Sequence, residues 1–344
     1  MSRNNSVTRI AATRNHTEPM FGSAVGGKLL NDKVWLWGDD NMLPYVLSLM
    51  ARRSVTHRRI LNDKADYIAG KGIAFSESIP LLGDIVGRAN GSGETLRSVI
   101  ARLALDEAMF GNAFMEVVTD SSHSFLSLYH VDASTCRLAR DSEHVVMHHD
   151  WRQFRHSEAC TLPLYPKFEE QEDGTLRSVV HYKDYEPMFS HYGVAPYIAG
   201  LGAAAILYKT DKWNIARLDN SFQLSGVMML DGAVDNEEDA DRMVRMAEER
   251  FSGNPGQVLF VLRDKGDDHS SRFIPINTSS DGDWKSLHEQ SESDLVVAHS
   301  WFRSLSGLDY SSGFSTERIL HEYEVALNTV ILSEQEQLLE PIRQ

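Results

Sequence analysis

The segment from Tyr192 to Phe222 constrains the fold most, because about thirty residues follow its Pro196 without another proline. Pro196 suits the first turn of a helix, and the alanine run at 203–205 has the highest helix propensity. A helix over residues 193–223 would be roughly 40 Å long at 1.5 Å per residue. Its polar residues are spread around much of the cylinder. We therefore expect it to pack against copies of itself or to bridge two domains, not to lie in a core.

A second long helix is predicted over residues 281–305, where apolar or small residues recur at spacings of three and four from Trp284 to Leu305. Between the two helices, residues 224–280 read as a compact α/β unit with strands in GVMML, QVLFVLR and RFIPI. A helix capped by Asp235, with Glu238 at its third position, is predicted inside this unit. The pattern indicates a stalk: one long helix leads out, a small domain lies at the far end, and a second helix returns.

Residues 25–192 read as an α+β domain, because the pattern switches between helical and alternating periods. We expect a helix that begins at Pro44 with Asp40 or Asn41 as its cap, a second from Ser54 to Gly70, and a third that Gly111 closes. Strands are expected in AFMEVV, SFLSLYHV and CRLAR. After a Gly- and Ser-rich loop, a last helix is expected from Ser315 or Thr316 to Pro341, and residues 1–24 read as a polar N-terminal arm.

Composition excludes several functional classes. The 34 basic and 49 acidic residues give a net charge of −15, which argues against tight wrapping of nucleic acid but not against its passage. The two cysteines, Cys136 and Cys160, indicate a reducing compartment with no disulfide framework. No apolar run reaches the eighteen residues of a membrane span, and no secretory signal is present, so we expect a cytoplasmic protein.

Motifs for catalysis or metal binding do not emerge. The sequence contains no P-loop, HExxH, GxSxG or CxxC motif. His148 and His149 are adjacent on a predicted strand, so they would point to opposite faces, and surface or edge positions are expected for them. We expect no catalytic residue, no metal and no cofactor.

Several stretches, in order, resemble the portal proteins of tailed double-stranded DNA bacteriophages, the head–tail connectors that form a ring at one capsid vertex. These stretches are HRRILNDKADYIAGKGIAF, LALDEAMFGNAFMEVV, SLYHVDASTCRLARD, YGVAPYIAGLGAAAILYKTDKWNIARLDNSFQLSGVMML, SWFRSLSGL and FSTERILHEYEVALNTVILSEQEQLLEPI. The resemblance covers roughly residues 40–341. Many members of the family continue into a further helical crown, which is expected here to be minimal, absent or removed. The N-terminal arm has no clear counterpart.

The resemblance implies an α+β portal fold. Its parts would be an N-terminal arm (1–24), a wing domain (25–192), a first stem helix (193–223), a clip domain (224–280), a second stem helix (281–305), a tunnel loop (306–314), and a long wing helix with the C-terminus (315–344). It further implies a ring of about twelve copies around a channel for double-stranded DNA, with the clip facing the terminase large subunit and later the head–tail adaptor. The wing would meet the major capsid protein. The location would be the virion, reached from the host cytoplasm, with no membrane.

The resemblance also suggests residues for these tasks. The first stem helix offers Lys209, Lys212 and Arg217 as channel candidates, although pairing with Asp211 and Asp219 of neighbouring copies is the alternative. The tunnel loop would present Asp309, Tyr310, Ser311 and Ser312 to DNA, or would be a plain helix connection. The acidic clip helix offers charge to the motor or the adaptor through Glu237, Glu238, Asp239, Asp241, Glu248 and Glu249.

Two other classes stay open. An enzyme with an α+β core and a helical arm would need a phosphate loop or a ligand cluster, and the sequence shows neither. A different structural ring or a head–tail adaptor is the second alternative, although adaptors are usually far smaller than this chain.

Overall fold

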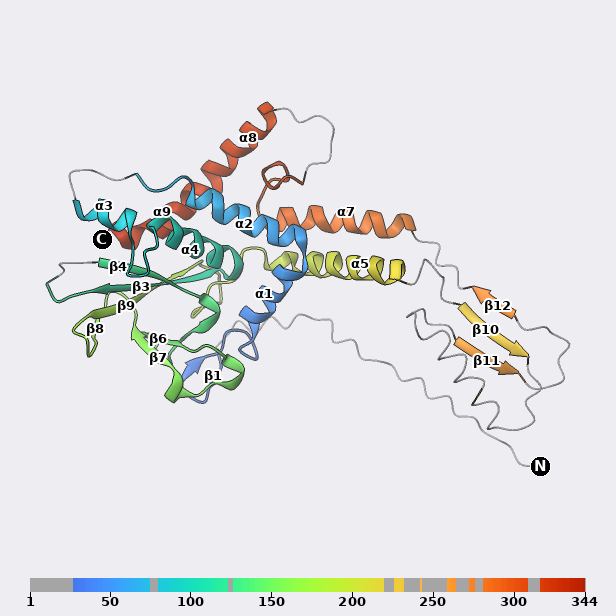
Figure 1. The fold of residues 1–344 in the computed structure, drawn as a ribbon, viewed down its shortest axis with the longest axis horizontal. Helices are drawn as coiled ribbons and strands as arrows, with labels where there is room; N and C mark the ends of the chain where they lie inside the picture. The colour runs from blue at the N-terminus through green and yellow to red at the C-terminus, as the bar shows by residue number, and fades with distance from the viewer. Residues whose placement is uncertain are drawn as a thin grey trace.

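The computed structural model describes residues 27–74, 80–122, 126–219, 226–231, 242, 259–263, 272–275, 281–308 and 316–343. Figure 1 shows an α+β body from which two long helices, α5 and α7, extend side by side. A small sheet lies beyond their far ends. This arrangement agrees with the predicted fold class and with the stalk that the sequence pattern indicated.

The body contains a four-stranded antiparallel sheet in the order β4-β3-β9-β8. Its strands are β3 (Asn112–Thr119), β4 (Leu126–Val131), β8 (Glu169–Glu170) and β9 (Leu176–Lys183). A second sheet, in the order β5-β6-β7, is also antiparallel. It comprises β5 (Cys136–Leu138), β6 (His144–Met147) and β7 (Cys160–Pro163), and a hairpin of β1 (Leu29–Leu30) and β2 (Val34–Trp35) lies beside it. The strands predicted around 113–118, 124–131 and 136–140 are confirmed.

Helices cover the four-stranded sheet. α4 (Leu96–Phe110) packs directly on β3 and β4, and α1 (Leu43–Arg53), α2 (Val55–Ala69) and α3 (Pro80–Gly87) pack on α4. Ser54 caps α2, because its hydroxyl accepts a hydrogen bond from the His57 amide at 3.3 Å, and Gly70 ends the helix at φ 56°. Gly111 ends α4 in the left-handed region at φ 64°. These boundaries confirm the predicted second and third helices.

The cap predicted for α1 is wrong. The residue before the helix is Met42, and it makes no side-chain capping bond. Asn41 is used elsewhere: its Oδ1 accepts hydrogen bonds from the Trp37 amide at 3.1 Å and from Arg137 Nε at 2.5 Å. Asp40 Oδ1 accepts from the Met42 amide in a local turn. The buried Arg137, far along the chain, thus binds the Asn41 side chain that was predicted to cap the helix. Pro44 lies in the first turn of the helix, as predicted.

The C-terminal helices pack back onto the body. α8 (Thr316–Ala326), a π-helical segment (Leu327–Ile331) and α9 (Leu332–Arg343) follow one another, and α9 contacts α2, α4 and β9. The helix continues two residues past its predicted end at Pro341. A buried cluster fixes this contact, in which Lys64 of α2 and Glu107 of α4 meet Glu334 of α9. Burial, with the charges of Glu334 and Asp184 close by, raises the pKa of the Glu107 carboxyl well above its usual range.

The two long helices have different limits from those predicted. We call α5 (Leu201–Asp219) and α7 (Asp281–Ala298) the helical pair. The predicted start at residue 193 is corrected, because residues 198–200 form a 3-10 turn and the chain before it is not helical. The cause lies at Gly193, whose amide donates to Asn112 Oδ1 and whose carbonyl accepts from Asn112 Nδ2, each at 2.9 Å. A Cβ at Gly193 would lie 2.1 Å from the Gly111 carbonyl oxygen, so only glycine fits there.

The end of α7 is also corrected, from the predicted residue 305 to Ala298. Ser300 takes a left-handed conformation at φ 49°, and the Trp301 amide donates to the Val296 carbonyl while the Ser300 amide donates to Val297. This is a Schellman motif, which ends a helix. The helical spacing that continued to Leu305 reflects burial of Trp301 and Leu305 in the body, not a continuous helix.

The small outer sheet has the order β11-β10-β12. Its strands are β10 (Gly226–Asp231), β11 (Leu259–Arg263) and β12 (Arg272–Pro275), with β11 parallel and β12 antiparallel to β10. All three strands were predicted. The helix expected to begin at Asp235 lies outside the described residues, except for Arg242, which is helical. Among the described helices, none combines the length and apolar composition that a bilayer span requires.

Candidate functional site

The helical pair is the part of the fold that the sequence marked as functional. The two helices contact each other through small and aliphatic side chains, with Ala204 and Leu207 of α5 packed against Leu295 of α7. Nearer the far end, Asp211 of α5 and His288 of α7 approach to 3.8 Å. At the body, Gly200 allows close packing, because a Cβ there would lie 2.6 Å from the Ala298 Cβ. The pair is therefore held by a narrow apolar seam and by its attachment to the body.

The lysines predicted to line a channel lie on the surface of the pair. Lys209 follows the buried Leu207 by two residues, which places it roughly 200° around the helix, and both Lys209 and Lys212 are exposed. Arg217 lies on α5, but its side chain is outside the described residues. The expected alternative partner Asp211 contacts His288 of the same chain. The structure thus brings the two lysines to one solvent-facing surface, away from α7.

A buried cluster of rings joins the base of the pair to the body. His57 Nδ1 of α2 and His299 Nε2, just after α7, are 2.8 Å apart, and both side chains are buried. Tyr197, just before α5, stacks on the His299 ring with centroids 4.6 Å apart, and its hydroxyl donates to the Met109 carbonyl at 2.8 Å. Tyr197, which precedes α5, and His299, which follows α7, therefore both contact His57 of α2 in a single cluster.

This cluster requires neutral imidazoles. Burial, reinforced by Arg58, lowers the pKa of His57 to about 4. Burial also lowers the pKa of His299 well below its usual value, and His57 and Lys64 act in the same direction. In a neutral pair one ring nitrogen donates and the other accepts, so the short contact is a hydrogen bond rather than a repulsive pair of cations.

A second polar contact holds the end of α7. Glu292 is 4 % exposed, and its carboxylate accepts hydrogen bonds from Arg303 Nη2 at 2.5 Å and from the Thr56 hydroxyl at 3.4 Å. Arg303 Nη1 also donates to the Ser293 hydroxyl at 3.0 Å. The chain that leaves α7 thus turns back and pairs with the helix that it has just left.

Sequence reasoning missed three of these contacts. His57 and His299 are 242 residues apart, and Thr56 and Glu292 are 236 apart, so no local pattern links them. The Asn112–Gly193 contact had a visible signal, since Gly111-Asn112 belongs to the GNA stretch and Gly193 precedes the long helix, but nothing local paired the two. Surface or edge positions on opposite faces were expected for His148 and His149. This is wrong for His148, which is 3 % exposed and packs against Trp151 and Phe154, and the ring of the exposed His149 stacks on it with centroids 4.7 Å apart.

Two groups of predicted site residues lie outside the described residues. They are the loop residues Asp309, Tyr310, Ser311 and Ser312, and the acidic residues Glu237, Glu238, Asp239, Asp241, Glu248 and Glu249. In the described parts of the chain, no group of three or more metal-ligating side chains gathers.

Comparison with known proteins gives a likeness of structure only. No family model matches the sequence, and no curated protein does. A chain in the neck of an empty gene transfer agent particle, computed with C6 symmetry, is similar, with a TM-score of 0.59 and 16 % identity over 89 % of this chain and 80 % of that chain. A chain in the neck of the native particle, computed with C12 symmetry, has a TM-score of 0.55 and 16 % identity over 88 % and 79 %.

An HK97-family phage portal protein from Corynebacterium diphtheriae is a more distant neighbour. Its TM-score is 0.48, with 12 % identity over 82 % of this chain and 90 % of that chain. The likeness to the neck structures agrees with the resemblance found in the sequence. The chain therefore has an α+β fold shared with a component of gene transfer agent particle necks.

Proposed function

We propose that this protein is a portal subunit, which forms a ring at one capsid vertex through which double-stranded DNA is packaged and ejected. One observation carries the proposal: an antiparallel helical pair leaves an α+β body and bears a small sheet at its far end, in a fold shared with a particle neck component (Figure 1). A neck joins parts of a particle around an axis, and a projecting helical pair repeated around such an axis encloses a channel. The role is structural, not enzymatic.

The assembled state in this proposal is a homo-oligomeric ring of about twelve copies. The neck structures of similar fold were computed with C6 and C12 symmetry, which supports closed rotational assembly. The helical pair itself exposes apolar side chains that a neighbouring copy would cover: Val297 is 75 % exposed, Ile215 58 % and Leu287 39 %. The ring would stand in the virion after assembly in the host cytoplasm.

The charge of the helical pair suits DNA that passes without binding. Between residues 201 and 215 of α5 and residues 285 and 298 of α7, three lysines stand against three acids that are not buried: Lys209, Lys212, Lys285, Asp211, Glu289 and Asp294. A fourth acid, Glu292, is buried and paired with Arg303. A surface with no excess of positive charge gains little from counterion release, so no position along it holds the phosphates. Lys209 and Lys212 would form sparse basic rings, with Arg217 as a further candidate.

The remaining parts of the proposal concern partners. The acidic helix with Glu237, Glu238, Asp239, Asp241, Glu248 and Glu249 would dock the terminase large subunit and later the head–tail adaptor. The loop with Asp309, Tyr310, Ser311 and Ser312 would face DNA in the channel. The body would contact the major capsid protein.

Site-directed photo-cross-linking tests the channel directly. A benzophenone amino acid replaces Lys209 or Lys212 in particles that contain packaged DNA, and a matched control replaces Lys167, which lies in the body and pairs with Glu143 at 2.6 Å. We expect DNA adducts at positions 209 and 212 and none at 167. Equal adducts at all three positions, or adducts at 167 alone, would contradict a channel lined by α5.

A further inference from the structure

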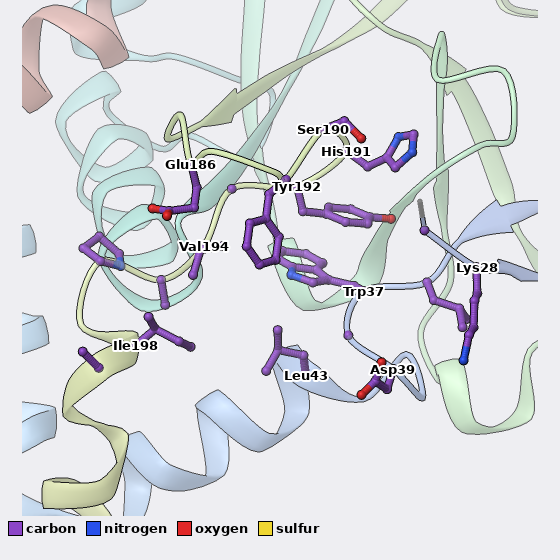
Figure 2. A pocket seen from close by; sticks show the side chains of 18 residues that line it. Lys28, Trp37, Asp39, Leu43, Glu186, Ser190, His191, Tyr192, Val194 and Ile198 are labelled. Carbon is purple, nitrogen blue, oxygen red and sulfur yellow. The ribbon is translucent and has the colours of Figure 1, made fainter. Parts of the chain in front are cut away.

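A cavity of about 400 Å³ lies between the segment where the described chain begins and the segment that leads into α5 (Figure 2). Its floor is aromatic: the buried rings of Trp37 and Tyr192 stack with centroids 4.6 Å apart and planes 3° apart. Leu43, Val194 and Ile198 extend the apolar lining. A cavity of this size accommodates one or two large apolar side chains, and nothing in the proposed portal role uses it.

One side of the cavity's edge is also apolar. Phe189 lines the cavity and is 37 % exposed, and the neighbouring Met188 is 69 % exposed. Met188 has φ 73°, a conformation that a residue with a long side chain rarely takes, so the loop is held in this shape. An exposed apolar edge beside an apolar cavity indicates a docking site.

The N-terminal segment begins at the wall of the cavity. Gly27 is itself a lining residue, and a Cβ there would lie 3.3 Å from the ring of His191, which also lines the cavity, and 3.0 Å from the Trp35 ring stacked on it. The chain before Gly27 therefore leaves from a point pressed against the cavity's own aromatic residues. Any segment a few residues upstream is at high effective concentration there, so its docking needs no second molecule.

The segment before Gly27 carries suitable side chains. Phe21 is the sole Phe, Tyr or Trp among residues 1–26, and it follows Met20. Five residues lie between Phe21 and Gly27, a reach of roughly 20 Å when extended, and Gly22 and Gly26 ease a reversal of direction. Chain length therefore permits these two apolar residues to return to the cavity.

Charge favours the same occupant. Residues 1–26 carry three arginines, Arg3, Arg9 and Arg14, and one acid, Glu18, whereas the whole chain has a net charge of −15. The lining contains two acids, Asp39 and Glu186, and one base, Lys28. A basic segment is attracted to a strongly acidic body, and this attraction adds to the apolar contact.

We propose that this cavity binds the chain's own N-terminal segment, with Met20 and Phe21 inserted over the stacked Trp37 and Tyr192 rings. The segment then fastens the β1–β2 region to the chain that leads into α5. The inference does not depend on the proposed portal function, because it concerns a contact within one chain.

Thiol labelling of the full-length protein tests it. Ala199 is exposed and lines the cavity, so an A199C variant carries a reporter at the site. A Y185C variant is the matched control, since Tyr185 is 88 % exposed in the same stretch and is not a lining residue. Both are made with C160S, because Cys160 is exposed while Cys136 is buried.

We expect F21S to raise the labelling rate of A199C at least tenfold and F21L to leave it slow, because leucine also fills an apolar cavity. The rate of Y185C should not respond to either change. A199C labelling that is fast with Phe21 present, or equal in F21S, overturns the proposal. Protection that appears only at high protein concentration and ignores F21S also overturns it, and assigns the cavity to a second copy.

Discussion

The body and the helical pair bury side chains in different ways. The body encloses a charged group with several partners: Arg137 is 2 % exposed, donates to the side chain and the carbonyl of Asn41, and lies 4.8 Å from the Trp151 ring centroid. The pair has a thin seam, in which Ala204 and Leu207 of α5 pack on Leu295 of α7. The body thus has an extensive core within one chain, whereas the pair is held by few buried side chains and exposes Ile215, Leu287 and Val297.

The largest expected effect compares two leucines. Leu103 in α4 is 0 % exposed, and Leu287 in α7 is 39 % exposed. Replacement of Leu103 by alanine should lower the free energy of unfolding by about 2–5 kcal/mol, because it opens a cavity in the core. The Leu287→Ala change should cost under about 1 kcal/mol in the monomer. Urea denaturation of monomeric protein measures both changes. Equal losses of unfolding free energy would contradict the difference in burial between the two leucines.

The next largest expected effect is a pH dependence of stability, which arises from the buried His57 at the base of the helical pair. The pKa of His57 is about 4 in the folded protein and near 6.5 when unfolded, so the unfolded state binds more protons between these values. Stability is therefore lost as pH falls through this window, by about 2 kcal/mol between pH 7 and pH 5 from His57 alone.

Replacement of His57 by glutamine removes this contribution, so the loss of stability between pH 7 and pH 5 should shrink by about that amount. Tyr197→Phe is the control: it removes the hydrogen bond to the Met109 carbonyl, at a cost of about 1 kcal/mol, without adding a group that titrates in this range. Denaturation at both pH values gives the result. An unchanged pH slope in the His57 variant would contradict neutral, buried histidines.

A smaller effect tests the helix end. Ser300 has φ 49°, so Ser300→Gly should raise stability by about 0.5–1 kcal/mol by relieving the left-handed strain. Ser293→Gly, inside α7, should lower it by about 0.5–1 kcal/mol, since glycine has low helix propensity and the contact with Arg303 is lost. Thermal unfolding distinguishes them. A loss of stability in both variants would mean that α7 does not end at this Schellman motif.

The smallest effect on the isolated subunit is expected at Val297, which is 75 % exposed on α7. Val297→Asp should change monomer stability by less than about 0.5 kcal/mol but should weaken self-association, because it places a charge in apolar surface. Analytical ultracentrifugation across concentrations, with Asp294→Asn as a control at another exposed position of α7, measures this. Unimpaired association would remove α7 from the interface between copies.

Local signals in the sequence predicted most of the fold. The helix from Ser54 to Gly70 was found because its cap and its terminal glycine are neighbours in sequence. The end of α7 was missed because a serine, not a glycine, takes the left-handed position. The non-helical chain around Gly193 was missed because Asn112, far away in sequence, holds it.

The candidate site was less accessible to sequence reasoning. The pattern placed Lys209 and Lys212 on a long helix, and their exposure follows from the helical period relative to Leu207. The ring cluster that anchors this helix joins His57, Tyr197 and His299, which share no motif and meet only after folding. Periodicity predicts which face of a helix is free, but it does not reveal what fixes the helix in place.

The most direct test of the central claim is the mass of the purified assembly by native mass spectrometry, with electron microscopy of the same sample. We expect a closed ring of about twelve copies of the 38.7 kDa chain, with a central hole that the helical pairs surround. A monomer or dimer at all concentrations, with the exposed face of α7 open to solvent, would contradict it.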